Sequence, residues 1–169
     1  MKKTGLFYSF NTRKSAIAAE KIAEALGKKN VDMVNAEEVL EETFLLYDNL
    51  ILSLPTWFDG ELPNYWDEFI PAIEDMNLKG KTFALFGLGN QKEYPENFVD
   101  ALGIMYDILK KQGATIVGET LAEGYVFESS KALRNGKFVG LALDFDNQKK
   151  QADQKIKDWA DNIKKEFKI

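Results

Sequence analysis

The sequence predicts an α/β fold in which helices cover both faces of a parallel sheet. Short, almost unbroken apolar runs such as Leu50–Leu54 are typical of central parallel strands, which are buried on both sides. Segments with helical periodicity follow these runs. Five strands alternating with helices favour right-handed crossovers into one sheet, giving a three-layer α/β/α architecture. At 169 residues, we expect one domain over residues 1–169.

The first predicted elements are a strand at residues 5–8 and an amphipathic helix at residues 13–26, closed by Gly27. The loop between them, residues 9–15, is polar. Because the first N–H groups of a helix lack partners and lie at the positive end of its dipole, this turn suits a phosphate. The loop also fits an ordinary helix cap, and it has neither a Walker A nor a GxGxxG pattern.

The later elements continue the alternation. We expect strands at residues 30–34, 50–54 and 82–88, and a last strand that begins at 115–117 and resumes near 141–143. Between them we expect a brief helix after Asn35, a helix carrying Trp66 to Met76 that Pro71 kinks or splits, and a helix capped by Asn97 or nearby and closed by Gly113. A final helix is expected at residues 148–167. Residues 119–140 are punctuated by glycine without a helical period, which indicates an insertion into the last strand.

The composition excludes several kinds of chemistry. Without cysteine there are no disulfides, thiolate nucleophiles or cysteine-bound clusters, and without histidine the usual general base and the commonest metal ligand are missing. Redox chemistry would therefore need a bound organic cofactor. The net charge of −5 disfavours nucleic acid and favours basic partners, although solubility alone also explains it. With no long apolar run, we expect a cytoplasmic protein that does not engage membranes.

Two aromatic residues, Trp57 and Tyr94, lie in polar loops that follow central strands. A loop aromatic is usually a packing plug, but two of them at one crevice can sandwich a flat ring system. This interpretation indicates a planar cofactor with a phosphate tail. A peptide beside Gly60 could then turn its carbonyl toward a ring nitrogen on reduction. Asp144 and Asp146 either cap the last helix or bind a sugar-alcohol chain.

These stretches are similar to the flavodoxins of the long-chain type over essentially the whole chain. The matching segments are residues 3–8, Pro55-Thr56-Trp57 with Gly60-Glu61-Leu62, Gly89-Asn90-Gln91 with Tyr94 and Asn97-Phe98, and residues 130–144 within the insertion. The resemblance implies strand order 2-1-3-4-5, with the cofactor at the switch point between the first and third strands, an arrangement of which flavodoxin is itself a standard example.

The resemblance further implies one non-covalently bound FMN and low-potential one-electron transfer, without catalytic residues or a metal. The implied cofactor-binding residues are Ser9, Phe10, Asn11, Thr12, Arg13, Lys14, Ser15, Pro55, Thr56, Trp57, Phe58, Asp59, Gly60, Leu88, Gly89, Asn90, Tyr94, Asn97 and Asp146. Of these, Asn11, Thr12, Lys14 and Ser15 would hold the phosphate, and Trp57 and Tyr94 would flank the isoalloxazine. Asp146 would reach the ribityl chain.

The chain departs from the family pattern at three positions. Phe10 replaces a hydroxyl residue of the phosphate loop, Arg13 replaces a glycine, and Asn90 stands where an acid is common. Arg13 either contacts the phosphate or strains the loop, and Asn90 should make the reduced flavin easier to form. Two alternatives therefore stay open: a paralogue with weakened FMN binding that serves as an interaction module, and an FMN-dependent reductase of a small substrate. For the carrier we expect a monomer whose partners are basic-surfaced reductases and electron acceptors.

Overall fold

The computed structural model describes residues 3–169. Its strands are β1 (Thr4–Tyr8), β2 (Asp32–Asn35), β3 (Asn49–Ser53), β4 (Thr82–Leu88), β5 (Thr115–Val117), β6 (Thr120–Leu121), β7 (Leu133–Arg134), β8 (Lys137–Phe138) and β9 (Leu141–Leu143). Its helices are α1 (Arg13–Leu26), α2 (Glu41–Leu45), α3 (Asn64–Glu74), α4 (Asp100–Lys111) and α5 (Lys149–Phe167), with short 3₁₀ helices η1 (Lys28–Asn30) and η2 (Ala36–Glu38). None of these helices is long and apolar enough to cross a bilayer.

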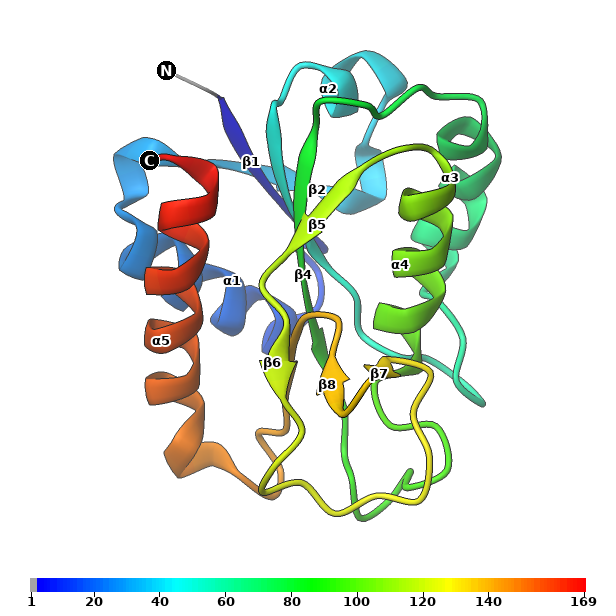
Figure 1. Cartoon of the computed structure of the whole chain (residues 1–169), viewed down its shortest axis with the longest axis vertical. Coiled ribbons are helices and arrows are strands. Elements are labelled where there is room, and N and C mark those ends of the chain that lie inside the picture. Colours follow the sequence, from blue (N-terminus) through cyan, green and yellow to red (C-terminus); the bar gives the residue numbers. More distant parts are fainter. Residues whose placement is uncertain (1–2) are drawn as a thin grey trace.

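The main sheet is parallel, with strand order β2-β1-β3-β4-β5. Helices α1 and α5 cover one face, and α3 and α4 cover the other (Figure 1). This confirms the predicted α/β/α class and the strand order 2-1-3-4-5. The strand order reverses beside β1, so the carboxyl ends of β1 and β3 diverge into a crevice.

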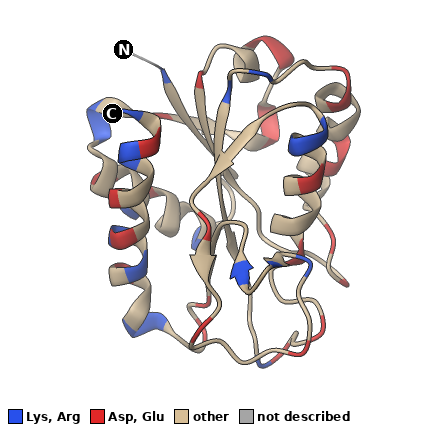
Figure 2. Cartoon of the chain, in the orientation of Figure 1, with Lys and Arg blue, Asp and Glu red and all other residues tan. Residues whose placement is uncertain are grey.

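Alternating side chains on the strands build the two halves of the core. Phe7 belongs to the cluster under α3 and α4, whereas its neighbour Leu6 belongs to the cluster under α1 and α5. In the same way Leu52 and Ile51 face opposite layers. Charged residues lie mainly on the helices and loops, and the central strands carry few of them (Figure 2). The buried strands are therefore continuous apolar runs in the sequence because each face has its own cover.

The insertion interrupts the edge strand, as predicted. β5 pairs with the first half of β4 and β9 pairs with its second half. Between them the chain forms a small antiparallel sheet, β6-β8-β7. Two hydroxyls of the insertion donate to backbone carbonyls at the edge strand: Thr120 Oγ1 to Gly140 O at 2.7 Å, and the Tyr125 hydroxyl to Ala142 O at 2.6 Å.

Two of the predicted boundaries near the N-terminus need correction. The second strand begins at Asp32 instead of Asn30, because residues 28–30 form a 3₁₀ turn directly after Gly27. The predicted brief helix after Asn35 is a single 3₁₀ turn, capped where the Asn35 side chain accepts a hydrogen bond from Glu37 N–H. Helix α2 was not predicted, since five residues are too short to show a helical period.

Two helices also begin or continue differently from the prediction. Pro71 does not split α3, which runs unbroken from Asn64 to Glu74 with Pro71 exposed. Helix α4 begins at Asp100 and its N-cap is Val99, two residues after Asn97, at or near which the cap was predicted. Val99 has no capping hydroxyl or amide, and a threonine from another loop supplies the missing acceptor, as described below.

Candidate cofactor-binding site

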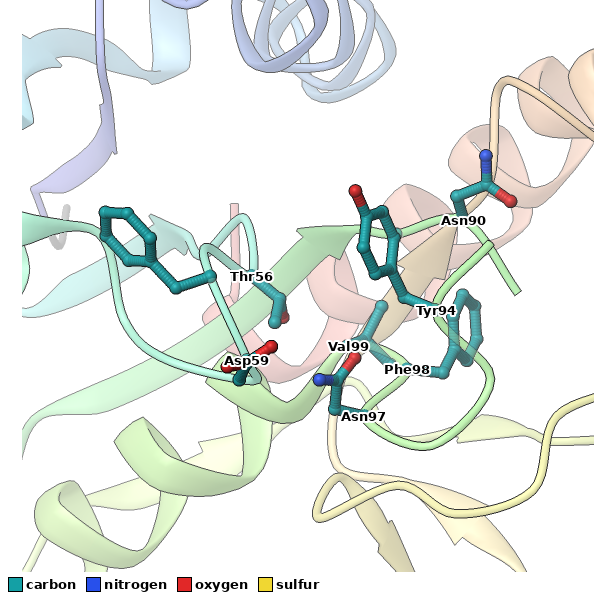
Figure 3. A pocket seen from close by; sticks show the side chains of 9 residues that line it. Thr56, Asp59, Asn90, Tyr94, Asn97, Phe98 and Val99 are labelled. Carbon is teal, nitrogen blue, oxygen red and sulfur yellow. The ribbon is translucent and has the colours of Figure 1, made fainter. Parts of the chain in front are cut away.

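A crevice opens at the carboxyl ends of β1, β3 and β4, where the sequence predicted a ligand. It consists of two adjoining cavities of about 300 and 340 Å³, each within the range of small-molecule sites. Both are lined by Thr56, Gly89, Asn90 and Tyr94. Figure 3 shows Thr56 and Asp59 on one wall of the second cavity and Tyr94 and Asn97 on the other. The predicted residues Pro55, Trp57, Leu88 and Asp146 line the first cavity, and Phe58 lines the second.

The two predicted stacking residues, Trp57 and Tyr94, line the same cavity. Trp57 is held edge-on by Tyr65, with ring centroids 5.8 Å apart and an interplanar angle of 87°. Tyr94 is half-exposed, and its backbone N–H donates to Asn90 O at 2.9 Å. The two loops therefore present their aromatic side chains to one cavity, whose other walls combine apolar side chains such as Leu88 and Phe145 with polar ones, an arrangement suited to a flat ring.

The turn that carries Trp57 is closed by two backbone hydrogen bonds. Trp57 N–H donates to Glu61 O at 2.9 Å, and Glu61 N–H donates to Trp57 O at 2.8 Å. Within the turn, Phe58 has φ of 48° and Gly60 has φ of 88°. A side chain at Gly60 would also place its Cβ 2.8 Å from Asp100 Oδ2. Glycine is therefore required at position 60, for conformation and for space.

The start of α4 lies beneath this turn. Ala101 N–H donates to Thr56 Oγ1 at 3.1 Å, so a residue of the crevice caps the helix from outside. Asp100 is buried, and its Oδ1 accepts from Lys131 N–H of the insertion at 2.8 Å. Burial raises the pKa of Asp100 and outweighs this hydrogen bond, which acts to lower it. Val99 lines the cavity with φ of 48°, a strained conformation for a β-branched residue.

At the other end of the crevice, the N-terminus of α1 offers donors for an anion. Within the described chain, the backbone N–H groups of Arg13, Lys14 and Ser15 have no hydrogen-bond acceptor. Ser15 Oγ is buried and also has no partner. Lys14 lines the crevice and pairs with Asp146 at 2.9 Å. A buried hydroxyl without a partner beside several unpaired N–H groups fits a phosphate.

Most of the remaining side chains of the predicted phosphate loop do not line the crevice. Thr12 lines the crevice, but Ser9 and Asn11 contact Glu37 of η2. Phe10 is half-exposed against Tyr8, with ring centroids 4.8 Å apart. Arg13 lines a different cavity, between α1 and α5. Its backbone is helical and is not among the positive-φ residues, so the chain avoids the strain that replacement of a glycine suggested.

Asp144 holds the loops around the crevice together, although it does not line it. Its carboxylate accepts hydrogen bonds from Gln91 N–H at 3.0 Å, the Gln91 amide at 2.8 Å, and the Asn147 N–H and amide. The Asn147 amide also donates to Asn90 Oδ1 at 2.8 Å. Burial alone would raise the pKa of Asp144, but these hydrogen bonds outweigh it and lower the pKa.

Sequence reasoning missed several residues around the crevice. Phe98, Val99, Glu93 and Phe145 line it although none was among the predicted site residues. Phe145 stands between two acids that the sequence had singled out, so its position after the last strand was an available signal. Phe98 and Val99 resemble the apolar start of a helix, and Glu37, 28 residues from Ser9, gave no signal at all.

The protein has an open parallel α/β sheet with an aromatic-lined crevice at its switch point. Beside the crevice lies a helix N-terminus whose N–H groups suit an anion. These features define the class of proteins that bind flat, phosphate-bearing cofactors. The sequence model of the family described as Flavodoxin matches residues 6–159. The chain is 43% identical to a flavodoxin of Trichodesmium erythraeum over 171 aligned residues, covering 100% of both chains. It is 40% identical to flavodoxin 1 of Escherichia coli over 167, covering 98% of this chain and 95% of the relative. The chain belongs to the flavodoxin family.

A solved structure supports the same assignment. The crystal structure of Fusobacterium nucleatum flavodoxin bound to flavin mononucleotide superposes with a TM-score of 0.92. The two sequences are 36% identical, and the match covers 98% of this chain and 99% of the other. The fold is thus that of a protein crystallised with FMN.

Proposed function

We propose that this protein is a one-electron carrier that binds one FMN non-covalently in the crevice between the loops after β1, β3 and β4. The observation that carries the proposal is the crevice itself, which has aromatic side chains at one end and Thr12 and Lys14 from the start of α1 at the other, where the neighbouring Ser15 hydroxyl is buried and unpartnered. Family membership and the FMN-bound structure of a relative support it. When bound, FMN supplies the electron chemistry, and the chain supplies binding, orientation and electrostatics.

The residues divide between the two ends of the cofactor. We assign the phosphate to the N–H groups at the start of α1, to Ser15 Oγ and to Lys14. Trp57 and Tyr94 take the ring between them, and Asp146 lies beside Lys14, where it can meet the sugar-alcohol chain. The side chains do no acid–base or covalent work, so the absence of histidine and cysteine has no cost to this function.

The turn at residues 57–61 and the neutral Asn90 tune the potential in this proposal. Gly60 has the positive φ that allows its peptide to change orientation at low cost. Asn90 is held by Asn147 and carries no charge, so it does not oppose a negative charge on the ring. The acidic groups that do are Asp59 and Glu93, which line the cavities, and Asp100, buried below the turn.

The partners follow from the exposed charges around the crevice. Asp59, Glu61, Glu93 and Glu96 are exposed on the loops at the ring end. These carboxylates favour basic-surfaced reductases and electron acceptors, whose association would weaken as salt rises. A monomer of one domain in the cytoplasm remains our expectation for the free protein, and light scattering would test the oligomeric state.

Absorption spectroscopy and titration test the function. The purified protein, or the apoprotein after addition of FMN, should show flavin absorption bands and accept electrons one at a time in a reductive titration. FMN should bind more tightly than riboflavin. A colourless product that fails to bind added FMN would refute the proposal. Equal affinities would favour the paralogue with a weakened phosphate loop, and substrate turnover without a second carrier protein would favour the reductase.

A further inference from the structure

Two side chains of the loop between β1 and α1 hydrogen-bond a carboxylate instead of facing the crevice. The Ser9 hydroxyl donates to one carboxylate oxygen of Glu37, and the Asn11 amide donates to the other at 3.0 Å. Ser9 is fully buried. The backbone of the same turn is tied down beside them, because Asn35 Oδ1 accepts from Phe10 N–H at 3.4 Å and from Glu37 N–H at 3.2 Å. The turn after β2 thus holds the loop after β1 in place, through hydrogen bonds to the side chains and to the backbone of that loop.

These hydrogen bonds determine which donors of the loop remain for an anion. Ser9 Oγ accepts from Asn11 N–H at 3.2 Å and from Thr12 Oγ1 at 3.1 Å while its own proton goes to Glu37. The Thr12 hydroxyl has only one proton, and that proton is used inside the loop. The donors left for a phosphate are therefore the N–H groups of residues 13–15, Ser15 Oγ and Lys14.

We infer that Glu37 is a positioning residue of the phosphate site: its carboxylate acts as a fixed internal anion that holds residues 9–12 in the shape that presents the α1 donors to the phosphate of FMN. The inference rests on the proposed function. Glu37 reaches the loop from the 3₁₀ turn η2 that follows the neighbouring strand β2, 28 residues from Ser9 in sequence, and lines neither cavity of the crevice. It therefore acts through Ser9 and Asn11 rather than by contact with the cofactor.

The negative charge of Glu37 works against this role, so the balance has to be weighed. A carboxylate near a phosphate dianion repels it. Glu37 is exposed, however, so water and salt screen the repulsion, whereas the hydrogen bonds to the buried Ser9 hydroxyl are short-range and directional. Loss of the Glu37 carboxylate leaves Ser9 and Asn11 without their acceptor and frees the loop to move. We therefore expect the positioning effect to exceed the repulsion.

Three variants separate shape from charge. Glu37→Ala removes both hydrogen bonds and the charge. Glu37→Gln removes the charge alone, because its amide can accept from Ser9 and donate to Asn11 once the Asn11 amide turns over. Glu38→Ala is the matched control, since Glu38 lies in the same 3₁₀ turn, is exposed, and has no hydrogen-bond or ion-pair partner among residues 3–169. Each apoprotein is titrated with FMN and with riboflavin, and its urea unfolding midpoint is recorded.

We expect Glu37→Ala to weaken FMN binding about tenfold while riboflavin binding changes less than about twofold, the size of one lost hydrogen bond to a charged group. Glu37→Gln should bind FMN as tightly as the wild type or slightly more tightly, and Glu38→Ala should match the wild type for both ligands. The inference is overturned if Glu37→Ala tightens FMN binding, or if it leaves the ratio of FMN to riboflavin affinity unchanged with a wild-type unfolding midpoint. Equal loss for both ligands with a lowered midpoint would show a general structural role and also overturn it. If the wild type binds neither ligand, the proposed function fails instead.

Discussion

Asp144→Asn should destabilise the protein strongly, because a buried carboxylate organises three segments around the crevice. Its two oxygens accept hydrogen bonds from Gln91 and Asn147, and through them it positions Asn90 and Val126, whose N–H donates to Gln91 Oε1 at 2.6 Å. Asparagine has nearly the same shape but replaces one acceptor oxygen with a donor group. At least one of the N–H groups that now face a carboxylate oxygen would face another N–H group instead.

The size of the effect follows from the number of hydrogen bonds to the charge. Hydrogen bonds to a charged group contribute about 1.5–3 kcal/mol each, and leaving a buried donor unpaired costs a similar amount, so we expect the substitution to lower the free energy of unfolding by about 2–4 kcal/mol. For a protein of this length, that corresponds to a fall in melting temperature of roughly 4–16 °C.

The pH dependence gives a sharper test than the size. The pKa of Asp144 is lower in the folded protein than in an unfolded chain. Its charge therefore stabilises the fold above the unfolded pKa of about 4, and the contribution is lost as the pH falls through the lower, folded pKa. The difference in stability between wild type and Asp144→Asn should thus be constant near neutral pH and shrink below about pH 4.

Urea denaturation of the apoproteins from pH 7 to pH 3 measures both quantities. Asp146→Asn is the control for stability, because Asp146 follows the same strand but is exposed, and among residues 3–169 its side chain makes only a surface ion pair with Lys14, worth about 1 kcal/mol or less. If Asp144→Asn differs from the wild type by less than about 0.5 kcal/mol at pH 7, or if the difference stays the same down to pH 3, the account of Asp144 is incorrect.

Three further predictions concern cofactor binding. Gly60→Ala should weaken FMN binding at least about tenfold, measured by fluorescence titration, whereas Gly124→Ala, which has a similar positive φ with open space around it, should leave the affinity unchanged and cost only about 1 kcal/mol of stability. Arg13→Gly should change the FMN affinity less than about threefold, because the side chain lines the cavity between α1 and α5; a larger loss would make it a phosphate ligand and a larger gain an obstruction. Trp57→Ala should weaken the binding of FMN and of riboflavin alike, whereas Ser15→Ala should weaken the binding of FMN alone. Calorimetric titration with both ligands measures the four affinities. The assignment of the two ends of the cofactor is contradicted if the two variants behave the same.

Much of the fold was predictable because its periodicities are strong. The helix at residues 13–26 and the strand at residues 82–88 were predicted with the observed ends, since each has a clear apolar pattern and a clear stop. The interrupted last strand was predictable because β9 repeats the apolar composition of a central strand after a stretch without any period. By contrast, α2 is too short to show a pattern, and the short 3₁₀ turn at residues 28–30 displaced the second strand.

The candidate site was predictable only in part. Loops after apolar strands could be placed at one edge of the sheet from topology alone, and Trp57 and Tyr94 do line one cavity. Side-chain partners across the fold could not be read from the sequence. Local propensity does not predict a positive φ at Val99, and no pattern links Ser9 with Glu37. These features arise from tertiary contacts, which override local preference.

The hydroxyls of Thr120 and Tyr125 have a consequence for how copies of the chain behave toward one another. β9 forms the open margin of the sheet beyond β4, and an uncovered strand at such a margin is a template for pairing with another chain. The two hydroxyls occupy the carbonyls of Gly140 and Ala142 that an incoming strand would need. The insertion thus shields a surface that would otherwise promote aggregation, and a version of the chain shortened at residues 119–140 would have to protect that margin by other means.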